Sequence, residues 1–222
     1  MKGMKVFGTL NPYNIPLKKR RTLGLTMANY SFIKAIIRYS NYDEFHFFID
    51  FIEKEDSFDE FKKWLKLGEN YINKIKVYHF GKMQDIIQGN TYNLIHHWDP
   101  NISKTCNFRE LFPNNKKFPI VAFVHAIAPP SMYEIIVKIL LSETKPYDAL
   151  ICPSNSLKSA LEKYLNNVSE FFSEKYNTEI KYNGRLITIP LGIDTEKFRP
   201  RNKKMARKRL KINENQIIIL CL

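Results

Sequence analysis

The segment Leu186-Ile187-Thr188-Ile189-Pro190-Leu191-Gly192-Ile193-Asp194-Thr195-Glu196-Lys197-Phe198-Arg199-Pro200 gives the clearest indication of the fold class of this chain. It begins with a short apolar run typical of a strand, turns at Gly192, and is followed by a basic helical stretch. A second apolar run, residues 216–222, predicts another strand. Strand, turn, helix and strand in this order form the unit from which parallel α/β sheets are built.

The same alternation runs through the whole chain. The expected strands cover residues 5–10, 44–50, 75–80, 92–98, 119–125, 147–153, 185–190 and 216–222, and the expected helices cover 25–39, 57–67, 82–88, 132–141, 154–175 and 202–210. Residues 120–124 are apolar throughout, as a strand covered on both faces should be. We therefore predict an α/β protein with a Rossmann-like, doubly wound parallel sheet and helices on both of its faces.

The order of these elements also predicts the domain organisation. We expect residues 1–190 to form an N-terminal domain, residues 191–202 a linker, and residues 203–222 the start of a second domain. The apolar strand expected at residues 216–222 has no later element in this chain to cover its other face. We therefore expect the chain to be the N-terminal part of a two-domain protein.

Composition narrows the class of protein. The chain has 222 residues, 44% of them hydrophobic, which is enough to bury a sizeable core. No apolar run approaches the roughly 18 residues of a membrane-spanning helix, and the N-terminal sequence lacks the pattern of a secretory signal. The three cysteines do not have zinc-site or disulfide-framework spacing, so we expect reduced thiols and a cytoplasmic protein.

Positive charge is concentrated in two places. Residues 18–21 carry four cations and residues 199–211 carry eight, so these clusters account for twelve of the thirteen net positive charges. Such clusters suit phosphate groups or an anionic membrane surface, and a solvated basic face is the alternative. No DNA- or RNA-binding motif accompanies the charge. We expect peripheral contact with the inner face of a membrane and no nucleic-acid partner.

The first expected loop is the first candidate for ligand binding, because ligands of open α/β sheets bind at the carboxyl ends of the strands. It includes Gly8, Thr9 and Asn11, and its glycines are too sparse for the G-x-G-x-x-G turn of nicotinamide or flavin sites. We therefore expect no such cofactor. Arg20 and Arg21 would suit a ligand that carries phosphate or carboxylate, although a loop with solvated charges remains the alternative.

Three later strands also end in polar residues. His96 and His97 are adjacent on a strand and point to opposite faces, so we predict no metal site, with one histidine at the crevice and the other packed. Asp99 follows and could bond ligand hydroxyls. His125 ends an apolar strand, where a titratable residue could meet a ligand, although from the residues alone a structural histidine with satisfied hydrogen bonds is the better interpretation. Ser154 reads as a helix N-cap, with substrate contact as the alternative.

Residues 190–200 resemble the inter-domain segment of family-4 glycosyltransferases, which usually reads P-N-G-V-D-x-x-x-F-x-P. The spacing from Gly192 through Asp194 to Pro200 matches, and Leu191 replaces the usual Asn. The segment that ends in His125 is similar to the T-V-H-D segment of that family, with Ala in place of the Asp. Residues 148–156 are similar to its D-x-V-I-x-x-S segment, and the first strand and loop also match.

The resemblance implies the N-terminal, acceptor-side half of a two-Rossmann (GT-B) glycosyltransferase involved in carbohydrate or glycan biosynthesis. Such enzymes transfer a sugar from a nucleotide-sugar to an acceptor, generally with retention of configuration and without a bound metal or cofactor. The acceptor would be a sugar, a lipid-linked molecule or a protein. The implied site consists of His125 as the catalytic residue, Gly8, Thr9, Asn11, Arg20, Arg21, His97, Asp99 and Ser154 around the acceptor, and Gly192 and Asp194 in the inter-domain motif. The family's Glu-x7-Glu donor motif is absent, so we expect this chain alone to transfer sugar very poorly.

Two other functions remain open at this point. The chain could be a non-enzymatic Rossmann-like module that binds an anionic membrane or nucleic acid through its basic patches, and such binding would be sensitive to salt. A sugar-nucleotide epimerase or dehydrogenase is disfavoured because the Gly-rich fingerprint is missing.

Overall fold

The computed structural model describes residues 4–10, 24–49, 63, 65–128, 131–196 and 198–219. The chain divides into two compact units, Met1–Ile189 and Pro190–Leu222. Expected site residues Asn11, Arg20 and Arg21 lie outside the described residues. The expected helix over residues 57–67 also lies mostly outside them.

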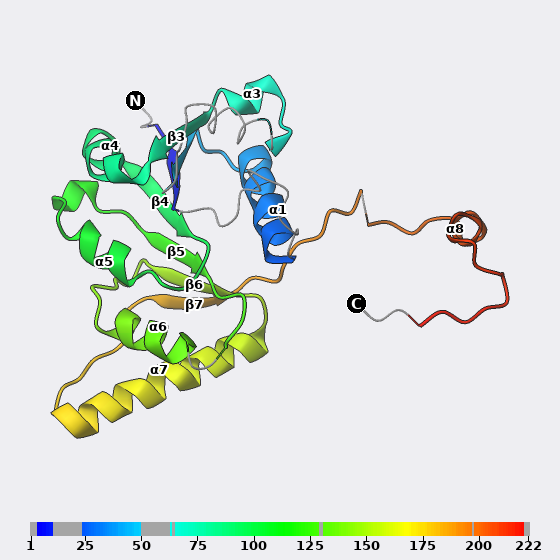
Figure 1. Cartoon of the computed structure of the whole chain (residues 1–222). Coiled ribbons are helices and arrows are strands. Elements are labelled where there is room, and N and C mark those ends of the chain that lie inside the picture. Colours follow the sequence, from blue (N-terminus) through cyan, green and yellow to red (C-terminus); the bar gives the residue numbers. More distant parts are fainter. Residues whose placement is uncertain are drawn as a thin grey trace. The chain divides into compact units, whose positions relative to one another are not determined.

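The first unit is built on a parallel sheet (Figure 1). Its strands are β1 (Val6–Leu10), β2 (Glu44–Ile49), β3 (Ile75–His79), β4 (Tyr92–His97), β5 (Ile120–Phe123), β6 (Ala149–Cys152) and β7 (Arg185–Thr188). These seven strands lie in the order β3-β2-β1-β4-β5-β6-β7, and every neighbouring pair is parallel. The predicted Rossmann-like α/β fold class is confirmed.

Helices cover both faces of this sheet. The helices of the first unit are α1 (Gly24–Tyr39), α3 (Glu69–Ile72), α4 (Met83–Gly89), α5 (Ser103–Arg109), α6 (Ser131–Leu140) and α7 (Asn155–Tyr176), with 3₁₀ turns η1 (Phe80–Lys82) and η2 (Asn114–Lys116). Ile33 and Ile37 of α1 pack with Phe7 on one face, whereas α4, α5, α6 and α7 pack on the other. Each large apolar side chain buried in this way contributes about 1.5–3 kcal/mol to folding.

The longest helix, α7, has well-defined ends. Ser154 accepts a hydrogen bond from the backbone N–H of Leu157 at 3.2 Å, which is the N-cap geometry expected from the sequence. Asn177 ends the helix in the left-handed conformation with φ of 50°, a conformation that Asn tolerates better than most residues. Leu161, Leu165 and Val168 form the buried face.

The second unit contains helix α8 (Lys203–Leu210). Residues 216–219, the described part of the strand expected at 216–222, form no strand. A strand requires a neighbouring backbone to bond, and no described strand of this unit offers one. Ile217 and Ile219 are accordingly each 92% exposed. The expectation of a strand is wrong for these residues.

A buried ion pair at the amino-terminal edge of the sheet joins four elements. Arg109, in α5, donates to both carboxylate oxygens of Asp148, at 2.6 and 2.9 Å, and both side chains are fully buried. Asp148 directly precedes β6, and its carboxylate also accepts from the backbone N–H of Ile120 in β5. Its carbonyl accepts from the N–H of Arg185 in β7. The pair therefore connects α5 to the start of three neighbouring strands.

We expect Asp148→Asn to lower the free energy of unfolding by about 3 kcal/mol, because it leaves the guanidinium of Arg109 buried without a countercharge. Urea unfolding followed by circular dichroism measures this change. Glu134→Gln is the control, since it breaks the exposed Glu134–Lys138 pair and should leave the unfolding midpoint unchanged. A midpoint for Asp148→Asn equal to that of the control would contradict a central role for the buried pair.

Candidate functional site

The strand order reverses between β1 and β4, and this switch point locates the candidate site. The chain proceeds from β1 to β2 and β3 on one side and from β4 to β5, β6 and β7 on the other. The crevice of an open α/β sheet lies outside the carboxyl ends of its strands at such a point. Leu10 of β1 is in register with His97 of β4, and His97 with Ala122 of β5. The residues that follow β4 and β5 are therefore close in space.

His125 lies two residues beyond the end of β5 and is held in one orientation. Its Nε2 is 3.1 Å from the backbone carbonyl oxygen of Trp98, which follows β4. A carbonyl oxygen only accepts, so Nε2 carries the proton and Nδ1 becomes the acceptor of the neutral ring. The ring also stacks on Phe123 with centroids 5.7 Å apart. Burial lowers the pKa of His125, which favours the neutral ring.

His96 and His97 project from opposite faces of β4, as their adjacency predicts. His96 is buried, and its Nδ1 lies 3.3 Å from Thr9 Oγ1. His97 stays partly exposed, and its Nε2 lies 2.8 Å from the hydroxyl of Thr105 in α5. Burial is the main cause of a lowered pKa in both rings. The pKa of His96 lies well below its usual value, and that of His97 is lowered to about 4.

An aromatic cluster surrounds His96. The ring of Phe32 in α1 stacks on it at 4.8 Å, and those of Trp98 and Phe123 meet it edge-on at 4.6 and 5.5 Å. His96 Nε2, Trp98 Nε1 and both polar atoms of the Asn29 side chain are buried without a hydrogen-bond partner. The faces of the neighbouring aromatic rings accept only weak hydrogen bonds from N–H groups. The cluster therefore favours an uncharged His96.

Asp99 begins the loop after β4. Its Oδ1 accepts from the backbone N–H of Asn101 at 2.8 Å, and the side chain remains partly exposed. The negative charge of Asp99 acts to raise the pKa of His97 and of His125, against the stronger effect of burial. One carboxylate and two imidazoles therefore lie near one another at the carboxyl edge, where they can exchange hydrogen bonds with ligand hydroxyls.

Three other expected acceptor contacts have structural roles here. Thr9 is fully buried in β1, and its hydroxyl lies beside His96 Nδ1, so it positions that ring. Gly8 is also buried, and a Cβ atom there would lie 3.0 Å from the ring of Tyr92. Ser154 is used as the N-cap of α7. Contact of these three residues with an acceptor stays a prediction, as it does for His97 and Asp99.

The inter-domain residues lie in the second unit. Asp194 Oδ1 accepts a hydrogen bond from the backbone N–H of Glu196 at 3.1 Å. The backbone carbonyl of Asp194 accepts one from the backbone N–H of Phe198, and the two bonds form a turn. Gly192 is exposed, has a negative φ and has no atom within 4 Å of a built Cβ. Its backbone conformation therefore does not require glycine in this structure.

Sequence reasoning missed Trp98, Thr105 and Phe32. Trp98 holds His125 through a backbone carbonyl, which carries no sequence signal. Thr105 and Phe32 reach the histidines from α5 and α1, and only the tertiary fold brings them there.

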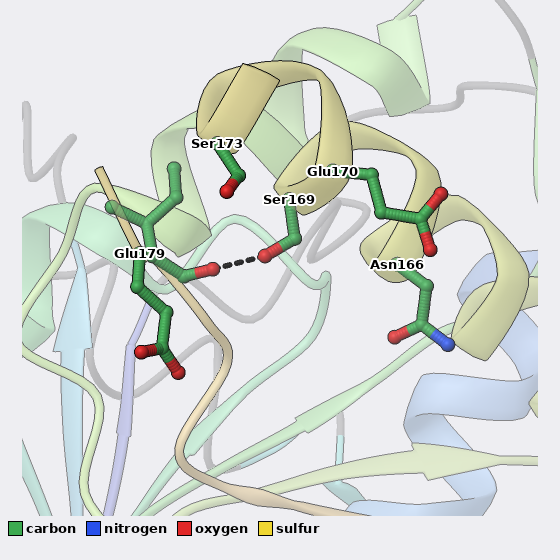
Figure 2. A pocket seen from close by; sticks show the side chains of 6 residues that line it. Asn166, Ser169, Glu170, Ser173 and Glu179 are labelled. Atoms are coloured by element: carbon green, nitrogen blue, oxygen red, sulfur yellow. Dashed lines mark hydrogen bonds between the residues drawn. The ribbon is translucent and has the colours of Figure 1, made fainter. Parts of the chain in front are cut away.

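A hollow of about 240 Å³ lies elsewhere, beside the second half of α7 (Figure 2). It is lined by Asn166, Ser169, Glu170, Ser173, Glu179 and Ile180. The hydroxyl of Ser169 donates to the carbonyl of Ile180. Because α7 begins at the carboxyl edge of the sheet and runs away from it, this hollow does not belong to the candidate site.

Two features are absent from the part of the chain that the structure describes. No group of three or more His, Cys, Asp or Glu side chains could hold a metal ion there. No helix in the same residues has both the length and the apolar character needed to cross a bilayer.

Comparisons of this chain with protein-family models, with curated proteins and with solved structures gave no significant match. The fold and the geometry of the site therefore carry the functional argument.

The histidines predict acid sensitivity of the fold. His96 is neutral when folded, whereas an unfolded histidine has a pKa near 6.5, so the unfolded state binds the extra proton as pH falls. The free energy of unfolding should therefore be fully retained above about pH 6.5 and decrease below it. His96→Phe should flatten this decrease by up to about 1.4 kcal/mol per pH unit. Urea unfolding at a series of pH values measures both slopes, and identical slopes would contradict the assignment.

Proposed function

We propose that this chain is the acceptor-side part of a glycosyltransferase that moves a sugar from a nucleotide-sugar to an acceptor with retention of configuration. The observation that carries the proposal is His125, which presents Nδ1 as an acceptor beside the switch point of a Rossmann-like sheet. The Gly192–Asp194 segment that follows the sheet supports the same reading. A Rossmann-like fold alone would not, because it serves many functions.

The proposed reaction gives each group a definite task. The acceptor hydroxyl oxygen forms the new glycosidic bond, the bond from the sugar to the nucleotide diphosphate breaks, and the hydroxyl proton leaves with the departing phosphate. His125 Nδ1 accepts a hydrogen bond from a hydroxyl of the transferred sugar and orients it. His97 and Asp99 lie along the same edge and bind acceptor hydroxyls. No cofactor or metal takes part.

The proposal also covers the acceptor and the setting of the reaction. A sugar, a lipid-linked molecule or a protein could present the hydroxyl, and Arg20 and Arg21 are assigned to a phosphate or carboxylate on it. We place the reaction in the cytoplasm. Cys106 and Cys152, which are buried free thiols, are compatible with that setting.

We expect His125→Ala to lower kcat for sugar transfer by about 10²–10³-fold, with little change in KM for the donor, because it removes an interaction at the reacting sugar. The measurement is release of nucleoside diphosphate from a panel of nucleotide-sugars, using this chain and any longer product of its gene. This chain alone should turn over very slowly. His79→Ala is the matched control, since His79 is an exposed histidine at the end of β3.

The outcomes separate two claims. Absence of turnover with every donor and acceptor, in this chain and in any longer product of its gene, would overturn the glycosyltransferase proposal. Full activity of His125→Ala in an active enzyme would leave the reaction in place and remove His125 from it.

A further inference from the structure

Residues 199–211, the basic segment, differ from the rest of the chain in charge balance. They contain eight lysines and arginines and no acidic residue. Elsewhere cations commonly have acidic partners, for example Lys76 with Glu44 at 2.6 Å. Among the described residues, none of the eight cations forms an ion pair. The segment therefore carries a concentrated positive charge that no described acidic side chain offsets by an ion pair.

Helix α8 organises this charge. The side chain of Asn202 caps its N-terminus by accepting from the backbone N–H of Met205 at 3.1 Å. The guanidinium of Arg207 donates to the backbone carbonyls of Asn213 and Gln216, which fixes the turn that follows. No side chain of α8 is buried. The cations are thus displayed on a defined helix and do not contribute to a core.

The helix also exposes apolar side chains. At 100° per residue, four cations occupy an arc of about 140°; they are Lys203, Lys204, Arg207 and Lys208. Met205 and Leu210 lie outside this arc, on either side of Arg209, and are 73% and 67% exposed. A basic helix with solvent-facing apolar side chains has the composition of helices that lie in a membrane interface.

We propose that α8 docks on an anionic lipid surface. Phospholipid headgroups supply the negative charge that the cations lack, and Met205 and Leu210 reach the boundary of the acyl chains. The long aliphatic stems of lysine and arginine let their charges reach the headgroups from the flanks of the helix. Nucleic acid is the less favoured ligand, because α8 has no aromatic side chain on which a base could stack.

The test is co-sedimentation of the 222-residue chain with phosphatidylcholine vesicles that contain either no or about 30% phosphatidylserine. We expect binding only to the anionic vesicles and its loss at high salt. The triple variant Lys203→Gln, Lys204→Gln, Lys208→Gln should bind about 100-fold more weakly, since each cation contributes about fivefold. Met205→Ser with Leu210→Ser should also weaken binding.

The matched control removes an equal number of positive charges, three, from the first unit. Lys82, Lys104 and Lys163 are exposed, and their replacement by Gln should change binding by only a few fold. Equal loss in the two triple variants, or equal binding to neutral vesicles, would overturn the proposal. Preferential binding of single-stranded or duplex DNA in competition with the vesicles would overturn it as well. Vesicle binding requires no sugar transfer, so its failure is distinct from failure of the proposed enzyme activity.

Discussion

The buried contact between Arg109 and Asp148 is the constraint on which the second half of the sheet depends. The carboxylate of Asp148 accepts from both ends of the guanidinium and from the backbone N–H groups of Ile120 and Lys145. Arg109 also donates to the carbonyls of Phe118 and Glu143. A buried pair repays its desolvation only with such extensive hydrogen bonding. These partners fix where β5, β6 and β7 begin, and therefore where their carboxyl ends emerge.

The two edges of the sheet consequently have different chemistry. At the amino edge, the opposite charges of Arg109 and Asp148 are paired. At the carboxyl edge, His96 is neutral inside aromatic rings, and His97 and His125 remain partly exposed with one ring nitrogen each engaged. Bound partners fix the ring orientations before a ligand arrives, which reduces the cost of binding. The amino edge, which the Arg109–Asp148 pair holds in place, thus positions the carboxyl edge, which carries the candidate site.

The sequence was sufficient for the features that depend on local pattern. Apolar runs predicted the strands of the sheet, adjacency predicted the opposite directions of His96 and His97, and Ser154 was recognisable as a cap. It was insufficient for contacts between distant residues. Thr9 and His96 are 87 residues apart, and His125 and Trp98 are 27 apart. The prediction of a strand over residues 216–219 was wrong for the same reason. An apolar run becomes a strand only when the backbone of another strand forms hydrogen bonds with it.

The protonation states of His96, His97 and His125 limit what the carboxyl edge of the sheet can recognise. Burial lowers the pKa of His96, His97 and His125, and Asp99 adds a negative charge beside the last two. Neutral imidazoles and a carboxylate attract hydroxyl groups and give no electrostatic attraction to phosphate. Positive charge lies instead in residues 18–21 and 199–211. Phosphate would therefore gain no electrostatic attraction from these three histidines and Asp99. The carboxyl edge near His97 and His125 is accordingly better suited to hydroxyl groups than to anions.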